Sequence, residues 1–134
     1  MTLRLLLDTN VISDFVRGDP KVMRRLRGVA PDAIAVSTVT EMEIRYGLAI
    51  DPARTRRIAP TIDALLDAVT LVELSREDAR AAGEIRAALR RRGQPIGPYD
   101  VLLAGTALAR GLRLVTANVR EFSRVSGLTV ESWR

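Results

Sequence analysis

Short apolar runs alternate with longer amphipathic stretches along the whole chain. The runs predict strands that are buried on both faces, and the stretches repeat apolar residues with a helical period. Predicted strands cover residues 3–7, 33–37, 70–74, 112–116 and, as an edge strand, 128–131. Predicted helices cover residues 11–16, 20–27, 38–49, 51–67, 75–92 and 101–109, with a short turn at 119–122. This alternation predicts an α/β fold in which a parallel sheet has helices on both faces.

Several predicted helix ends carry local signals. Asp19 precedes a proline and predicts an N-cap, the stretch 75–78 resembles a capping box, and Gly93 and Gly111 predict helix stops. The apolar stripe expected on helix 38–49 consists of Val39, Met42, Tyr46 and Ala49.

Length and composition predict one globular domain over residues 1–134. The chain is 47% hydrophobic and 28% charged, which is ordinary for a soluble protein. No apolar run approaches the roughly 20 residues of a membrane span, and the run at residues 3–7 is too short for a signal peptide. We therefore expect a cytoplasmic protein that does not associate with membranes.

Histidine and cysteine are absent from the sequence. Their absence excludes a histidine general base, a cysteine nucleophile and a His/Cys zinc site. Hard cations such as Mg²⁺ need only carboxylate oxygens and water. A hydrolase built from this chain would therefore use acidic residues and a hard divalent metal.

Three acidic residues stand where a strand gives way to a helix or where a helix begins, namely Asp8, Glu43 and Asp100. In parallel sheets, ligands bind beyond the carboxyl ends of the strands, so these side chains are expected to converge. Asn118 and Glu121 follow the strand 112–116. Asn118 could add a neutral oxygen, and Glu121 either a further carboxylate or a solvated surface charge. A divalent cation would relieve the repulsion among such carboxylates and favour phosphodiester hydrolysis.

Asp8 and Asp100 each have a plainer interpretation as a helix cap. Thr9 and Asn10 already offer caps for the helix that follows Asp8, so the sequence favours Asp8 as a ligand. Asp100 at a helix start is stabilised by the helix dipole whether or not it binds a metal.

Glu41 and Glu43 compete for one role. Two positions apart on a helix, their side chains point about 200° away from each other. Glu43 shares its face with the small residues Thr40 and Gly47, which leave room for an ion. We therefore expect Glu43 to face the site and Glu41 to face solvent.

The net charge of +5 and the pI near 10.9 favour a polyanionic partner. Arg90, Arg91 and Arg92 lie upstream of Asp100 and would form a positive rim for RNA. All basic residues except Lys21 are arginine, a bias that GC-rich coding alone produces, and these arginines could equally form a solvated face.

Four motifs together resemble those of the PIN-domain ribonucleases and, among these, the VapC toxins of bacterial toxin–antitoxin pairs. They occur in order at residues 7–12, 37–47, 97–107 and 114–122. The resemblance implies a PIN-like three-layer α/β/α sandwich with a central, mostly parallel sheet of four to five strands. It also implies a metal-dependent endoribonuclease that arrests growth.

The same resemblance implies roles for individual residues. Asp8, Glu43 and Asp100 would bind one or two Mg²⁺ or Mn²⁺ ions, one tight site being favoured, and the hydroxyls of Thr9 and Thr116 would lie behind them.

The fourth acidic position departs from the family's commonest pattern, because Asn118 stands where many members carry Asp. Glu121 would then complete the cluster. The implied partners are structured RNA, with tRNA as the leading class, and a VapB-type antitoxin whose tail inserts near the active site. A homodimer, and a larger assembly with the antitoxin, are also implied.

Two other functions fit parts of the sequence. An apolar strand that ends in Asp8 also resembles the nucleophile strand of haloacid-dehalogenase phosphatases, although Asn10 stands where those enzymes carry a second acid. In a non-catalytic interaction module, the acids would merely cap helices.

Overall fold

A computed structural model describes residues 2–134 and contains a five-stranded parallel sheet in the order β3-β2-β1-β4-β5. The strands are β1 (Leu5–Leu7), β2 (Ile34–Ser37), β3 (Thr70–Val72), β4 (Arg113–Val115) and β5 (Val130–Glu131). Each strand is shorter than the range predicted for it. The predicted fold class is confirmed, with β5 at one edge as expected.

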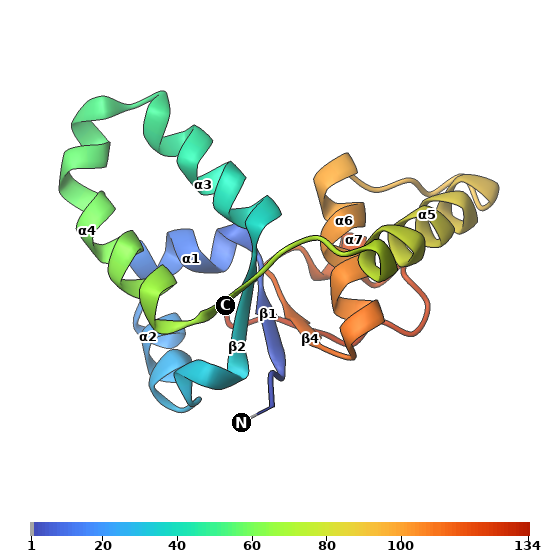
Figure 1. Cartoon of the computed structure of the whole chain (residues 1–134), viewed down its shortest axis with the longest axis horizontal. Coiled ribbons are helices and arrows are strands. Elements are labelled where there is room, and N and C mark those ends of the chain that lie inside the picture. Colours follow the sequence, from blue (N-terminus) through green and yellow to red (C-terminus); the bar gives the residue numbers. More distant parts are fainter. Residues whose placement is uncertain (1) are drawn as a thin grey trace.

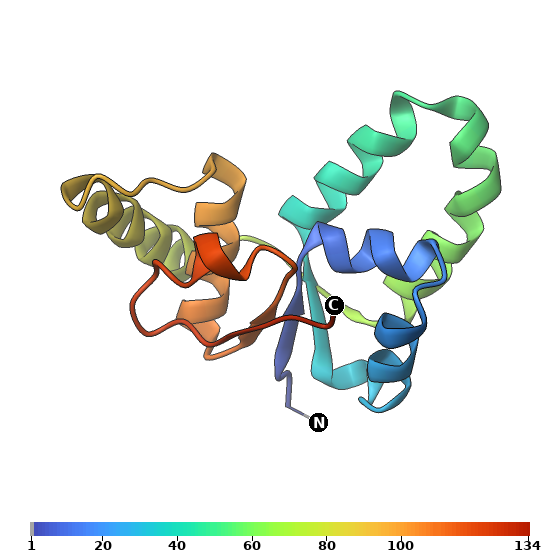
Figure 2. The same cartoon turned by 180° about the vertical axis from the view of Figure 1, so that it is seen from behind.

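Helices cover both faces of this sheet (Figures 1 and 2). They are α1 (Thr9–Val16), α2 (Pro20–Arg27), α3 (Thr38–Ala49), α4 (Pro52–Ala68), α5 (Arg76–Arg91), α6 (Pro98–Arg110) and α7 (Val119–Phe122), with a 3₁₀ turn at Pro31–Ala33. Helices α1 to α4 lie on one face and α5 to α7 on the other. None of the helices in residues 2–134 is long and apolar enough to cross a bilayer.

The alternation of side chains along β1 explains the three layers. Leu5 and Leu7 pack into the core beneath α1 to α4, whereas Leu6 between them packs into the second core beneath α5 and α6. Both cores are apolar, so the strand carries no polar residue until Asp8. This arrangement delivers Asp8 to the carboxyl edge of the sheet.

Helix α6 is central, as its apolar sequence predicted, with Leu103, Ala104 and Ala107 fully buried. It packs tightly on α5 through Gly105, where a Cβ atom would lie 2.7 Å from the backbone nitrogen of Ala82. Only glycine allows this approach without a shift of one helix.

The predicted start of this helix was wrong. It begins at Pro98 rather than at Val101, with Gly97 as N-cap, because proline's fixed φ suits the first helical position. Asp100 therefore lies inside the first turn. The cap of α1 also differs from the prediction, since Asp8 itself, not Thr9 or Asn10, is the N-cap.

The apolar stripe predicted for α3 was out of phase. The buried face consists of Thr40, Ile44 and Leu48, whereas Met42 and Tyr46 are exposed. The helix carries two apolar stripes, and only the one nearer Thr40 contacts the core beneath α1 and α4. Helix periodicity alone does not say which of two stripes turns inward.

Candidate active site

Asp8 is the most deeply placed acidic residue at the carboxyl edge of the sheet, with only 5% of its surface exposed. Its Oδ1 accepts a hydrogen bond from the backbone N–H of Thr9 at 2.7 Å. A buried ionised carboxylate needs such donors, because leaving it unpaired costs several kcal/mol.

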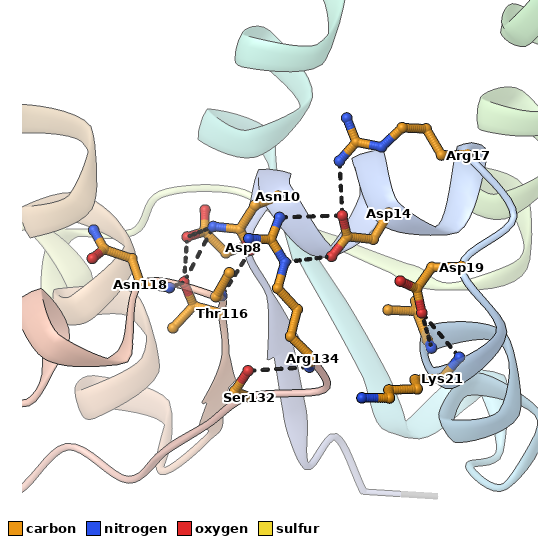
Figure 3. A network of polar contacts seen from close by, with 12 residues as sticks. Asp8, Asn10, Asp14, Arg17, Asp19, Lys21, Thr116, Asn118, Ser132 and Arg134 are labelled. Carbon is orange, nitrogen blue, oxygen red and sulfur yellow. Dashed lines mark hydrogen bonds and ion pairs between the residues drawn. The ribbon is translucent and has the colours of Figure 1, made fainter.

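The other oxygen of Asp8 is held by two side chains (Figure 3). The hydroxyl of Thr116 donates to Oδ2 at 2.8 Å, and Nδ2 of Asn10 donates to the same atom at 3.1 Å. Asn10 is itself fixed, since its Oδ1 accepts from the backbone N–H of Ala117 at 2.9 Å. The backbone N–H of Asn118 donates to the Thr116 hydroxyl oxygen at 3.0 Å. The segments after β1 and β4 are thereby joined at one carboxylate.

Asn10 is a residue of this site that the sequence analysis did not select. Its sequence position suggested a helix cap and argued against a phosphatase, yet in the structure it contacts Asp8, Thr116 and Ala117. The sequence offers one signal for this role. Asn10 lies two residues after Asp8, on a helix that begins directly after the strand.

Glu43 lies on the side of α3 that faces α1. The hydroxyl of Thr9 donates to its Oε1 at 3.1 Å. Glu41 lies on a different side of the helix, where it pairs with Arg45 at 3.5 Å and retains 28% side-chain exposure. Of the two, Glu43 is the one directed at the segment around Asp8, whereas Glu41 is half-buried rather than fully exposed to solvent.

Glu121 and Asn118 form a second polar group on α7 and the turn before it. Oε1 of Glu121 accepts from the backbone N–H of Gly97 at 2.9 Å, and its other oxygen accepts from the side-chain amide of Asn118. This contact draws the loop before α6 toward α7. A Cβ at Gly97 would lie 3.1 Å from Oδ2 of Asp100, so glycine also leaves space beside that carboxylate.

Asp100 experiences the charges of the other three acids. Burial, together with the negative charges of Asp8, Glu121 and Glu43, raises its pKa to about 6. The ionised form of Asp100 is therefore less stable, relative to its protonated form, in the folded chain than in water. Four acids therefore interact electrostatically at this edge of the sheet: Asp8, Glu43 and Asp100, and in addition Glu121.

The donor set suits a hard divalent cation, because every candidate ligand is a carboxylate or amide oxygen. Within residues 2–134, no three acidic side chains converge closely enough to enclose an ion together. Glu43 and Glu121 are instead turned toward the protein donors Thr9, Gly97 and Asn118. The charge at Asp100 would suit a cation, and Glu43 and Glu121 would have to turn away from these donors to join in binding one.

Arg90, Arg91 and Arg92 are exposed at the carboxyl end of α5, where the chain leaves for the loop to α6 (Figure 1). The guanidinium of Arg92 donates to the backbone carbonyl of Arg124. Arg124 in turn donates to the carbonyl of Pro95 at 3.1 Å. These contacts fix the loop that leads to Gly97 and Asp100.

Comparison with known proteins agrees with this fold. Residues 5–128 match the model of the PIN domain family. The chain is 36% identical over 131 residues to the tRNA(fMet)-specific endonuclease VapC of Shigella flexneri, covering 98% of both chains. It is 33% identical to the ribonuclease VapC2 of Haemophilus influenzae, again covering 98% of both.

Solved structures give the same result. A DNA-bound VapBC structure from Salmonella typhimurium matches with a TM-score of 0.90 and 33% identity, covering 99% of this chain and 100% of that one. VapBC2 from Rickettsia felis, bound to a DNA fragment from its promoter, matches with a TM-score of 0.91 and 27% identity, covering 98% and 100%.

The chain belongs to the PIN domain family and, within it, to the VapC ribonucleases. The family predicted from the four motifs is confirmed, and with it an endoribonuclease of the toxin–antitoxin type. Nothing in the site or in the relatives favours the phosphatase or the non-catalytic module.

Proposed function

We propose that the chain is a divalent-metal-dependent endoribonuclease toxin of one PIN-like domain, residues 1–134, acting in the cytoplasm. The observation that carries the metal dependence is the crowding of acids at the carboxyl edge of the sheet, where burial, followed by the negative charges of Asp8, Glu121 and Glu43, raises the pKa of Asp100 to about 6. A cation bound there would remove the repulsion that the folded chain otherwise bears.

Asp8, Glu43 and Asp100 would hold Mg²⁺ or Mn²⁺. When bound, the ion would polarise a phosphoryl oxygen and supply an activated water. Thr116 and Asn10 orient the carboxylate of Asp8, and Thr9 orients that of Glu43. Such contacts behind metal ligands affect metal affinity strongly.

We assign the fourth acidic role to Glu121 rather than to Asn118. The amide of Asn118 donates to the carboxylate of Glu121, so Asn118 positions that acid. Both residues then serve catalysis, Glu121 as the charged group beside Asp100 and Asn118 as its support.

Structured RNA is the proposed substrate class, with tRNA favoured because one relative is named a tRNA(fMet)-specific endonuclease. Arg90, Arg91 and Arg92 would bind RNA phosphates, since they are exposed at the end of α5.

A VapB-type antitoxin is the proposed protein partner. A groove of about 170 Å³ runs between α1, α3 and α4, with apolar walls that include Ile12, Ile44 and Ile58 and with Glu43 among its lining residues. An antitoxin tail lying in this groove would reach the carboxylates. We further propose a homodimer through the exposed stripe of Met42, Tyr46 and Ile50 on α3, and a larger assembly with the antitoxin.

Expression in bacteria tests the proposal. The parent chain should arrest growth, co-expression of a cognate antitoxin should relieve the arrest, and Asp100→Asn should abolish it. The variant must be shown to fold by a thermal melt. Arrest by a folded Asp100→Asn protein would mean that toxicity comes from binding and not from cleavage.

A further inference from the structure

A larger cavity, of about 630 Å³, is lined by residues at the amino ends of β1 and β4 and along the edge strand β5. It opens at the amino ends of β1 and β4 and shares no lining residue with the acidic site. Its apolar walls include Leu3, Leu5, Leu128 and Trp133. The volume falls within the range of about 300–1,000 Å³ that is typical of small-molecule sites.

Three arginines from separate elements line this cavity: Arg4 before β1, Arg25 on α2 and Arg113 on β4. Arg113 pairs with Oε1 of Glu131 at 3.2 Å. The other oxygen of Glu131 accepts the indole N–H of Trp133 at 3.0 Å. The one carboxylate among the lining residues is therefore engaged through both of its oxygens.

Arg4 and Arg25 have no such partner. Neither forms an ion pair with any acidic residue in the described part of the chain. Isolated surface arginines are ordinary, but these two share a concave lining with apolar walls. With one acid against three arginines, the lining carries an excess of positive charge.

We propose that this cavity binds a small phosphorylated ligand of nucleotide size. Two free guanidinium groups present planar sets of N–H donors that match phosphate oxygens, and the apolar walls suit a base or another nonpolar moiety. The phosphate could come from a free nucleotide or from the phosphorylated end of an RNA. Binding in this cavity is independent of the catalytic role of the carboxylates, because none of Asp8, Glu43, Asp100 and Glu121 lines it.

Trp133 is the single tryptophan of the chain and lines the cavity, so its fluorescence reports occupancy. The full-length Asp100→Asn protein, in EDTA and low salt, is titrated with AMP, adenosine or inorganic phosphate. AMP should change the emission saturably, phosphate should compete, and adenosine should bind at least tenfold more weakly than AMP. In the Arg4→Gln/Arg25→Gln variant, AMP affinity should fall at least tenfold.

The matched control is Arg56→Gln/Arg57→Gln, which removes the same charge from exposed positions on α4 outside the cavity. This control should leave AMP affinity within about twofold of the parent value. A thermal melt of each variant establishes that it is folded. Equal loss in both double variants would show a nonspecific charge effect and overturn the proposal.

Two further results would also overturn it. One is no saturable response of Trp133 to AMP up to about 10 mM, a concentration that would detect even very weak binding. The other is adenosine binding as tightly as AMP. A short 5′-phosphorylated RNA, compared with its unphosphorylated form, distinguishes the sources: tighter binding of the phosphorylated RNA than of AMP indicates an RNA end, and the reverse indicates a free nucleotide.

Discussion

The hydroxyl of Thr116 donates to Oδ2 of Asp8 at 2.8 Å, although 108 positions separate the two residues. Both atoms are buried. The contact ties the first strand to the fourth at the point where the sheet ends. It fixes the orientation of a carboxylate that, on our proposal, binds the metal.

Replacing Thr116 by valine removes this donor while keeping the side-chain shape. Cleavage by Thr116→Val should fall by about 10- to 100-fold through weaker metal binding, as is typical for the loss of a group that orients a ligand. Thr116→Ser keeps the hydroxyl and should retain most activity. Mn²⁺ titration of both variants measures the effect, and equal affinities would remove Thr116 from the proposed site.

The pair Glu43 and Glu41 offers a matched comparison on one helix. Glu43→Gln should abolish cleavage and greatly weaken Mn²⁺ binding, because Glu43 faces Thr9 and the segment around Asp8. Glu41→Gln should keep activity and change stability by no more than about 0.5 kcal/mol, since its ion pair with Arg45 is partly exposed. The reverse pattern would place the metal ligand two residues away from Glu43.

Asp100 predicts a pH-dependent stability in the absence of metal. Its pKa in the folded chain is about 6, above the ordinary value of 3.8, so the folded state binds more protons than the unfolded state between these limits. Stability from this group is therefore present at low pH and is lost as the pH rises through 6.

Asp100→Asn removes this effect. In EDTA at pH 7 the variant should be more stable than the parent by about 2 kcal/mol, after loss of the favourable charge at the start of α6 is subtracted. The difference should vanish or reverse near pH 4. Urea unfolding at both pH values measures it, and a parent that is more stable at pH 7 than the variant would contradict the repulsion.

The arginine cluster predicts salt-dependent RNA binding. Replacing Arg90, Arg91 and Arg92 by glutamine in the Asp100→Asn background should weaken tRNA binding and reduce the slope of log affinity against log salt by about 2 to 3. Replacing the exposed residues Lys21, Arg24 and Arg27 on α2 removes the same charge elsewhere. Equal slopes for both triple variants would show that Arg90, Arg91 and Arg92 are ordinary solvent-exposed residues with no specific role in RNA binding.

Hydrophobic periodicity predicted most of the fold because the sheet is parallel and fully covered. Its strands are therefore continuous apolar runs, and the helices between them are long enough to show their period. The errors occur where two local signals compete. Pro98 starts α6 three residues before its apolar pattern begins, and α3 has two apolar stripes of which only the one with Ile44 and Leu48 is buried.

The acidic residues were predictable from their places at the ends of elements, but their contacts were not. Glu121 binds the backbone of Gly97, a contact across 24 positions that depends on how α7 and the loop before α6 approach each other. Asn10 likewise gains its role only once the segment after β4 lies beside α1. No local pattern encodes such long-range packing.

The raised pKa of Asp100 has the same origin. Composition and spacing placed Asp8, Glu43 and Asp100 near one another, whereas the size of their interaction depends on burial and on the fourth acid, Glu121. The sequence indicated which acids lie near this edge of the sheet, and the fold determines how strongly their charges interact.

Cleavage of tRNA with and without a divalent cation tests the central claim most directly. The purified parent chain should cut total tRNA in Mg²⁺ or Mn²⁺, lose the activity in EDTA and regain it when metal is restored in excess. Asp8→Asn, purified identically, should be inactive throughout and thereby exclude a contaminating ribonuclease. Undiminished cleavage in EDTA by the parent, with none by Asp8→Asn, would contradict the metal-dependent mechanism.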